Sequence, residues 1–263
     1  MMRRIWTAYR VELFKAVHQR LAFLGPALLI LTTLSLTQVQ PVVRDGHGDY
    51  AFVAHATSVS LHLVGLLLLL MYCANLISSE LQSGVVRTIL VRSLRRSEYV
   101  AAKILLGLTY ALILTLTSAV AAWTVAAALG DMVGVTYGDE ILFTHPDMIR
   151  AYAMGVLFSL APQLATVAFA VLMSALFRSS GVAVTAAVGV WIAADAVKHP
   201  LGIAPYLFSS YVEMPWQVFA NQANGLDGRW WPDAGYCLAT SGVAFAIATA
   251  LAMWIMHRRN LHL

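Results

Sequence analysis

The side chains best suited to chemistry are few and lie in apolar surroundings. His55 and His62 are seven positions apart, so a helix would place both on one face, where histidines bind metals or relay protons. The sequence offers no third ligand beside them, so histidines that face a helix bundle or water are the favoured alternative. Cys73 and Cys237 lack the spacing of a metal site, and we predict that both are small core-facing or lipid-facing residues.

The sequence lacks the motifs of the enzymes that an apolar chain would suggest. Neither Gly-x-Ser-Gly nor His-Glu-x-x-His is present, so an intramembrane protease is not indicated. A phosphate-binding loop needs G-x-x-x-x-G-K-[ST], and the chain contains no Gly-Lys dipeptide. We therefore expect a chain that is not an enzyme and has no catalytic residues, no ATPase site, no metal and no cofactor of its own.

Composition identifies the setting of these residues as a membrane. Of 263 residues, 60% are hydrophobic and only 11% are charged, whereas soluble domains have about 25% charged residues. A helix needs about 20 apolar residues to cross the hydrocarbon core. Six stretches qualify as transmembrane helices, which predicts an all-α integral membrane protein: residues 21–38, 51–78, 104–130, 151–177, 181–197 and 234–256.

The basic residues give this layout an orientation. The N-terminus, residues 79–103, the turn at 178–180 and the C-terminus together hold 13 of the 17 Lys and Arg residues and three of the 13 Asp and Glu residues. The other side holds four basic and ten acidic residues. Because basic loops stay in the cytoplasm, both termini are expected there.

Three segments and three polar residues complete the layout. Residues 1–20 repeat apolar residues every three or four positions and predict an amphipathic interface helix, so that 21–263 forms one six-span transmembrane domain. Residues 199–233 are rich in proline and aromatic residues and predict short helices at the outer interface, or only an aromatic belt. Asn75, Gln163 and Asp195 lie within spans; with the histidines, Asn75 and Gln163 are candidates to line a cavity, and Asp195 is expected to pair locally with Lys198 or His199.

Residues 79–103, SELQSGVVRTILVRSLRRSEYVAAK, concentrate positive charge between the second and third spans. Helical spacing puts Glu80, Gly84, Arg87 and Val91 on one face, beside an apolar set of valine, isoleucine and leucine residues. This pattern predicts an amphipathic cytoplasmic helix that docks onto lipid head groups or another protein. The alternative is that the charges only set the orientation of the chain.

The same segment resembles the permease subunits of ABC transporters of the ABC-2 (type V exporter) family. Those permeases have an acidic residue after the second span, then a Gly, an Arg, a Leu, and an Arg about seven positions before a Lys. The matching residues of this chain are Glu80, Gly84, Arg87, Leu90, Arg96 and Lys103. The family often has Thr after the Gly and Pro before the Arg, where this chain has Val85 and Ser93.

The resemblance implies both a mechanism and partners. In that family the helix between spans two and three is a coupling helix, which sits in a cleft of an ATP-binding subunit, and the segment before the last span is re-entrant. We therefore expect two copies of a separate ATPase that binds ATP and Mg, a second permease subunit of the same or a related chain, and membrane lipid, but no nucleic acid. The complex would export a hydrophobic or amphipathic substrate across the inner membrane.

Other functions remain open at this stage. An ABC-type subunit can pass force to an outer-side partner without transporting a substrate. A membrane scaffold would have a similar composition. A secondary transporter would usually have more spans, internal repeats and broken helices, and no clear repeat is seen.

Overall fold

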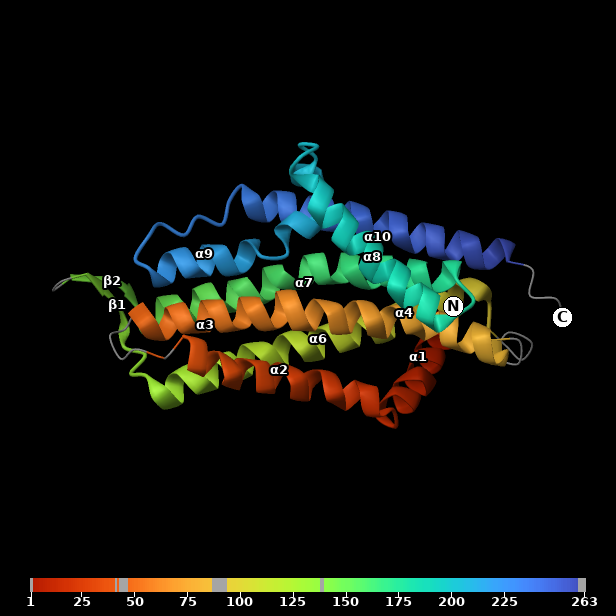
Figure 1. Ribbon diagram of the computed structural model, residues 1–263, viewed down its shortest axis with the longest axis horizontal. Coiled ribbons are helices and arrows are strands. Elements are labelled where there is room, and N and C mark those ends of the chain that lie inside the picture. Colours follow the sequence, from red (N-terminus) through yellow and green to blue (C-terminus); the bar gives the residue numbers. More distant parts are fainter. Residues whose placement is uncertain (1, 41, 43–46, 87–93, 138–139, 260–263) are drawn as a thin grey trace.

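The computed structural model describes residues 2–40, 42, 47–86, 94–137 and 140–259, and it is mostly helical. Its helices run along one long axis and form an elongated bundle (Figure 1). The α-helices of the described residues are α1 (Met2–Val17), α2 (Arg20–Val39), α3 (His47–Val59), α4 (Leu66–Ser83), α6 (Arg96–Leu129), α7 (His145–Leu176), α8 (Ser180–Lys198), α9 (Met214–Ala223) and α10 (Asp233–Arg258). A π-helical turn, Ser60–Gly65, joins α3 to α4.

Six helices of the described residues are long and apolar enough to cross a membrane, as the sequence predicts. They are Ala22–Val39, Asp49–Ser83, Arg96–Leu129, His145–Leu176, Ser180–Lys198 and Asp233–Arg258. This layout is that of a multi-pass membrane protein. At ~1.5 Å per residue, the three longest of these helices are each about 50 Å long, well beyond the ~30 Å hydrocarbon core, so their ends must project from it.

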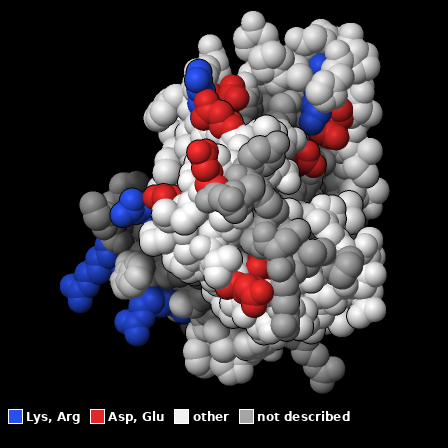
Figure 2. Space-filling view, turned by 90° about the vertical axis from the view of Figure 1, so that its left-hand side faces the viewer, with Lys and Arg blue, Asp and Glu red and all other residues white. Residues whose placement is uncertain are grey.

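Both ends of the described chain lie at the same end of the bundle (Figure 1). The far end of α4 and the beginning of α6 lie there as well. At the opposite end the chain forms a hairpin that the all-helical prediction omitted: β1 (Gly134–Tyr137) pairs antiparallel with β2 (Glu140–Thr144). Viewed from the hairpin end, the surface shows several separate groups of acidic side chains (Figure 2).

Among the described residues, the bundle packs around two large apolar clusters and a smaller third one. One of the large clusters is centred on α4, α6 and α7, and the other includes residues of α3, α6, α7 and α9. Close approach in the first of these depends on Gly107 of α6, because a Cβ atom there would lie 2.6 Å from Cγ1 of Val167 and 2.9 Å from Sγ of Cys73. Cys73 and Cys237 are both free and buried, so they are core-facing rather than lipid-facing.

The segment between α8 and α10 contains two short 3₁₀ turns, Ala204–Tyr206 and Phe208–Tyr211, followed by α9. Helix α9 packs against α3 and α7 near the hairpin end (Figure 1). Its aromatic residues Trp216 and Phe219 are fully buried, whereas Tyr206 and Trp231 are largely exposed. The segment thus consists of short helices, and the alternative of an aromatic belt does not fit Trp216 and Phe219, which belong to the core of the bundle.

Candidate functional site

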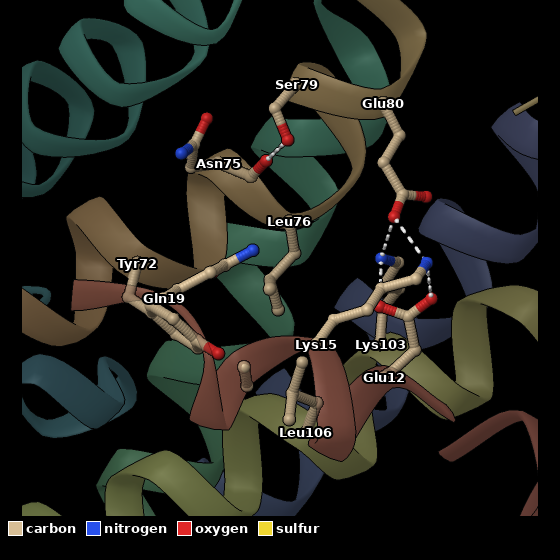
Figure 3. A pocket seen from close by; sticks show the side chains of 11 residues that line it. Glu12, Lys15, Gln19, Tyr72, Asn75, Leu76, Ser79, Glu80, Lys103 and Leu106 are labelled. Carbon is tan, nitrogen blue, oxygen red and sulfur yellow. Dashed lines mark hydrogen bonds and ion pairs between the residues drawn. The ribbon is translucent and has the colours of Figure 1, made fainter. Parts of the chain in front are cut away.

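Four charged side chains meet at the end of the bundle that holds both termini (Figure 3). Nζ of Lys103 donates to Oε2 of Glu12 at 2.6 Å and to Oε1 of Glu80 at 2.7 Å. Nζ of Lys15 donates to the remaining oxygen of Glu12 at 2.9 Å and to Oε1 of Glu80 at 3.3 Å. The two carboxylates thus hold the two ammonium groups between them, and we call these four residues the charge cluster.

The charge cluster joins three helices that are distant in the sequence. Glu12 and Lys15 come from α1, Glu80 from the last turn of α4, and Lys103 from the third turn of α6. The hydroxyl of Tyr99, one turn before Lys103, donates to Oε2 of Glu80 at 2.6 Å. The amphipathic helix predicted at the N-terminus is therefore bonded to α4 and α6.

Burial makes the balance of charge in the cluster important. The side chain of Lys103 is 2% exposed, and those of Glu12 and Glu80 are 10% and 15% exposed. Removing a charge from water costs several kcal/mol, which only a well-placed opposite charge offsets. Burial opposes the charged form of Lys15, but its bonds to Glu12 and Glu80 outweigh that cost and raise its pKa above the ordinary value.

Helix α1 is shaped to reach this position. Its inward face carries the small residues Ala8 and Ala16, both buried, one turn before and one turn after Glu12. Small side chains let the helix approach α6 closely enough for the Glu12 carboxylate to reach Lys103. A second polar contact between the same helices joins the hydroxyls of Tyr9 and Thr109 at 2.7 Å.

An open pocket of about 100 Å³ lies beside the charge cluster, between α1, α4 and α6 (Figure 3). Its lining includes the cluster itself and the polar residues Gln19, Tyr72, Asn75 and Ser79. Oδ1 of Asn75 is buried and has no hydrogen-bond partner among the described residues. Asn75, one of the residues predicted to line a cavity, thus lies at the wall of this pocket.

Comparison with known proteins places the chain in a family without assigning its chemistry. The family model that matches covers residues 40–262 and is described as "Protein of unknown function (DUF2705)". The chain belongs to the DUF2705 family. The matched range includes Glu80 and Lys103 and begins after α1, the helix that carries Glu12 and Lys15. No curated protein matches this DUF2705 member.

The residues predicted to form one docking helix in this DUF2705 protein lie in different elements. Glu80 belongs to α4, which ends at Gly84, where the backbone turns left-handed with φ +75°. Arg96 and Lys103 belong to α6, which begins at Arg96. The predicted helical face of Glu80, Gly84, Arg87 and Val91 is therefore wrong at Gly84, because the left-handed backbone of Gly84 ends α4 there. Arg87 and Leu90 lie outside the described residues.

Arg96 has an intramolecular role at the same end of the bundle. Its Nη1 donates to the backbone oxygens of Met256, His257 and Arg259 at 3.0, 2.7 and 2.8 Å. These carbonyls lie at the C-terminal end of α10, where helix carbonyls have no intrahelical donor. Arg96 therefore fastens the end of the last span to the start of α6, an arrangement that the sequence pattern did not indicate.

The two histidines predicted to line a cavity have different surroundings. His55 of α3 is exposed. His62 lies in the π-helical turn and pairs through Nδ1 with Oε1 of Glu213, just before α9. Across the described residues, no group of three or more His, Cys, Asp or Glu side chains is placed to hold a metal ion.

Two further polar residues that were predicted to lie within spans have partners inside the protein. Thr115 donates to Oε1 of Gln163 at 2.7 Å, and Gln163 borders a cavity of about 10 Å³. Asp195 pairs with Lys198, which confirms the predicted local pairing.

The sequence analysis missed Asp49, which is fully buried and accepts hydrogen bonds from the backbone N–H groups of Asp131 and Met132. The available signal in the sequence was an acidic residue at the start of one span and a Gly-Asp pair at the end of the next span.

Proposed function

We propose that the chain is the permease subunit of an ABC-2 type ABC transporter, driven by a separate ATPase that docks on the basic end of the bundle. One observation carries this proposal: the charge cluster binds α1, the end of α4 and the start of α6 together. The stretch of chain between α4 and α6, residues 84–95, begins and ends at those two helix ends. A force applied to that loop therefore acts on α1 and two long spans at once.

The distribution of charge supports the orientation in this proposal. Helix α1, the end of α4, the start of α6 and the end of α10 lie at the end of the bundle where both termini lie (Figure 1), and these are the parts of the chain in which the sequence concentrates Lys and Arg. An excess of Lys and Arg is typical of cytoplasmic loops, and the cytoplasm is where an ATPase finds ATP. The opposite end, with its hairpin and acidic side chains, would then face outward from the inner membrane.

Not all the residues that carry the resemblance are placed to contact an ATPase directly. Glu80 and Lys103 are mostly buried in the charge cluster, and Arg96 is bonded to α10. In this proposal these three residues transmit force inside the membrane subunit, and the ATPase itself contacts the loop around Gly84 and Arg87. The complex would contain two permease chains and two ATPase subunits, and it would export a hydrophobic or amphipathic substrate.

The experiment is an ATPase assay on the complex purified from its native membrane. Gly84→Pro and Arg87→Glu are each compared with Arg150→Glu, which changes an exposed arginine in α7 beside the hairpin. We expect Arg87→Glu to leave the fold intact and Gly84→Pro to distort the end of α4, because proline cannot adopt φ +75°. Both variants should lose stimulation of ATP hydrolysis by the permease, while Arg150→Glu retains it. Unchanged stimulation in both loop variants would refute the coupling role of this loop.

A further inference from the structure

The outward face of α1 combines positive charge with large apolar side chains. Trp6 and Phe14 are 58% and 69% exposed. Helix α1 also exposes three arginines and two valines, namely Arg3, Arg4, Arg10, Val11 and Val17. A face that contacts only water would not need an exposed tryptophan and phenylalanine, and a face buried in hydrocarbon would not hold three arginines.

The same face carries no negative charge. Glu12 is the only acidic residue of α1, and it points inward to the charge cluster, where Lys103 and Lys15 neutralise it. Because α1 is fastened from behind, through Glu12 and the Tyr9–Thr109 contact, its arginines are held on the outward side. The charge that this face presents is therefore wholly positive.

The placement of α1 suits a membrane surface. Helix α1 ends at Val17 and the first membrane-spanning helix, α2, begins at Arg20, so α1 lies at the end of a span. It turns away from the direction of α2 and crosses the end of the bundle (Figure 1). Helices that lie in the interface have basic residues for the lipid phosphates and aromatic or aliphatic residues for the upper acyl chains.

We propose that the outward face of α1 is a binding surface for anionic phospholipids. Arg3, Arg4 and Arg10 bind the phosphates of the head groups, and Trp6 and Phe14 insert beside the acyl chains. Complementary charge selects the lipid, because the face has three cations and no anion. The inference does not depend on an ATPase partner and would hold for a transporter or a scaffold alike.

The test uses the full chain with a fluorescent probe on this face. Phe14→Cys is labelled with bimane; Cys73 and Cys237 are buried, and labelling of the protein without the new cysteine gives the background. The labelled protein is reconstituted in phosphatidylcholine vesicles that contain a minor fraction of phosphatidylglycerol. Brominated phosphatidylglycerol or brominated phosphatidylcholine, at equal amounts, then quenches the probe when that lipid lies beside it.

We expect brominated phosphatidylglycerol to quench more strongly, and the preference to weaken as salt screens the charges. A basic residue near an anionic membrane contributes ~1 kcal/mol, so the relative affinity should fall about fivefold for each of Arg3→Gln, Arg4→Gln and Arg10→Gln. The matched control changes Arg150 and Arg229, which are 80% and 82% exposed, to Gln, and should leave the preference unaltered.

Two results would overturn the inference. Equal quenching by the two lipids, or a preference that survives in the triple arginine variant, would show that α1 does not select anionic lipid. A probe that neither lipid quenches, and that an aqueous quencher reaches, would show that this face lies outside the membrane surface and is free for a protein partner instead.

Discussion

Replacing Lys103 with Met tests whether the charge cluster holds the end of the bundle together. Methionine has a similar volume, so the change removes the charge and little packing. Glu12 loses a bond of 2.6 Å and Glu80 one of 2.7 Å, and two mostly buried carboxylates are left to share Lys15. Breaking a buried ion pair by removing one partner costs ~3–5 kcal/mol. For a chain of this size, that lowers the melting temperature by roughly 6–20 °C.

Comparison with the neutralised cluster makes the test specific. The triple variant Glu12→Gln, Glu80→Gln, Lys103→Met carries no unpaired buried carboxylate, and replacement of whole buried ion pairs is often nearly neutral. We expect it to recover most of the stability that Lys103→Met loses. Lys198→Met is the control, since its partner Asp195 is 46% exposed and such pairs contribute about 1 kcal/mol or less.

The assay is thermal unfolding in mild detergent, followed by the fraction of protein that remains monodisperse. The reasoning would be refuted if Lys103→Met unfolded within about 2 °C of the unchanged protein, which corresponds to less than ~1 kcal/mol. It would also be refuted if the triple variant were less stable than the single one, because the cost would then lie in lost contacts and not in uncompensated charge.

Further predictions concern helix ends and close packing. Gly84→Ala should cost ~1–2 kcal/mol of unfolding free energy, because the left-handed backbone disfavours a Cβ, although no atom of the described residues lies within 4 Å of that Cβ. Gly84→Asn should cost less in the same melting assay. Gly107→Ala should cost ~1–3 kcal/mol of unfolding free energy by overpacking. Gly189→Ala, on α8 where the Cβ meets no described atom, should stabilise the protein slightly. A stable Gly107→Ala variant together with a destabilised Gly189→Ala variant would contradict the packing described. Arg96→Gln should speed hydrogen exchange at the C-terminal end of α10, and unchanged exchange there would contradict its role.

The membrane layout was predictable because it depends on local composition. Each span needs about 20 apolar residues in sequence, and all six predicted stretches coincide with long helices. The ends of the helices are less predictable, because a helix can continue through charged residues beyond its apolar stretch. Span three was expected from residue 104, but α6 begins at Arg96, where the Glu98 side chain accepts the Arg95 backbone N–H at 3.0 Å.

The charge cluster was not predictable, because its members meet only after folding. Glu12 and Lys103 are 91 positions apart, and no periodicity links them. Lys103 was assigned to an exposed basic segment, although the apolar run that follows it, Ile104-Leu105-Leu106, was a signal of burial. Likewise, a helical wheel cannot show that Gly84 ends α4, because the wheel assumes that the helix continues.

The proposal that a separate ATPase docks on the basic end can be tested most directly by site-specific crosslinking in the native membrane. A photo-crosslinking residue replaces Ser83, which is exposed at the end of α4, and in a parallel variant it replaces Arg150 beside the hairpin. The account predicts that Ser83 crosslinks to a subunit that carries a phosphate-binding loop and hydrolyses ATP, with one copy per chain, and that position 150 does not. Crosslinks from Ser83 to lipid alone, with no nucleotide-binding subunit recovered, would contradict it.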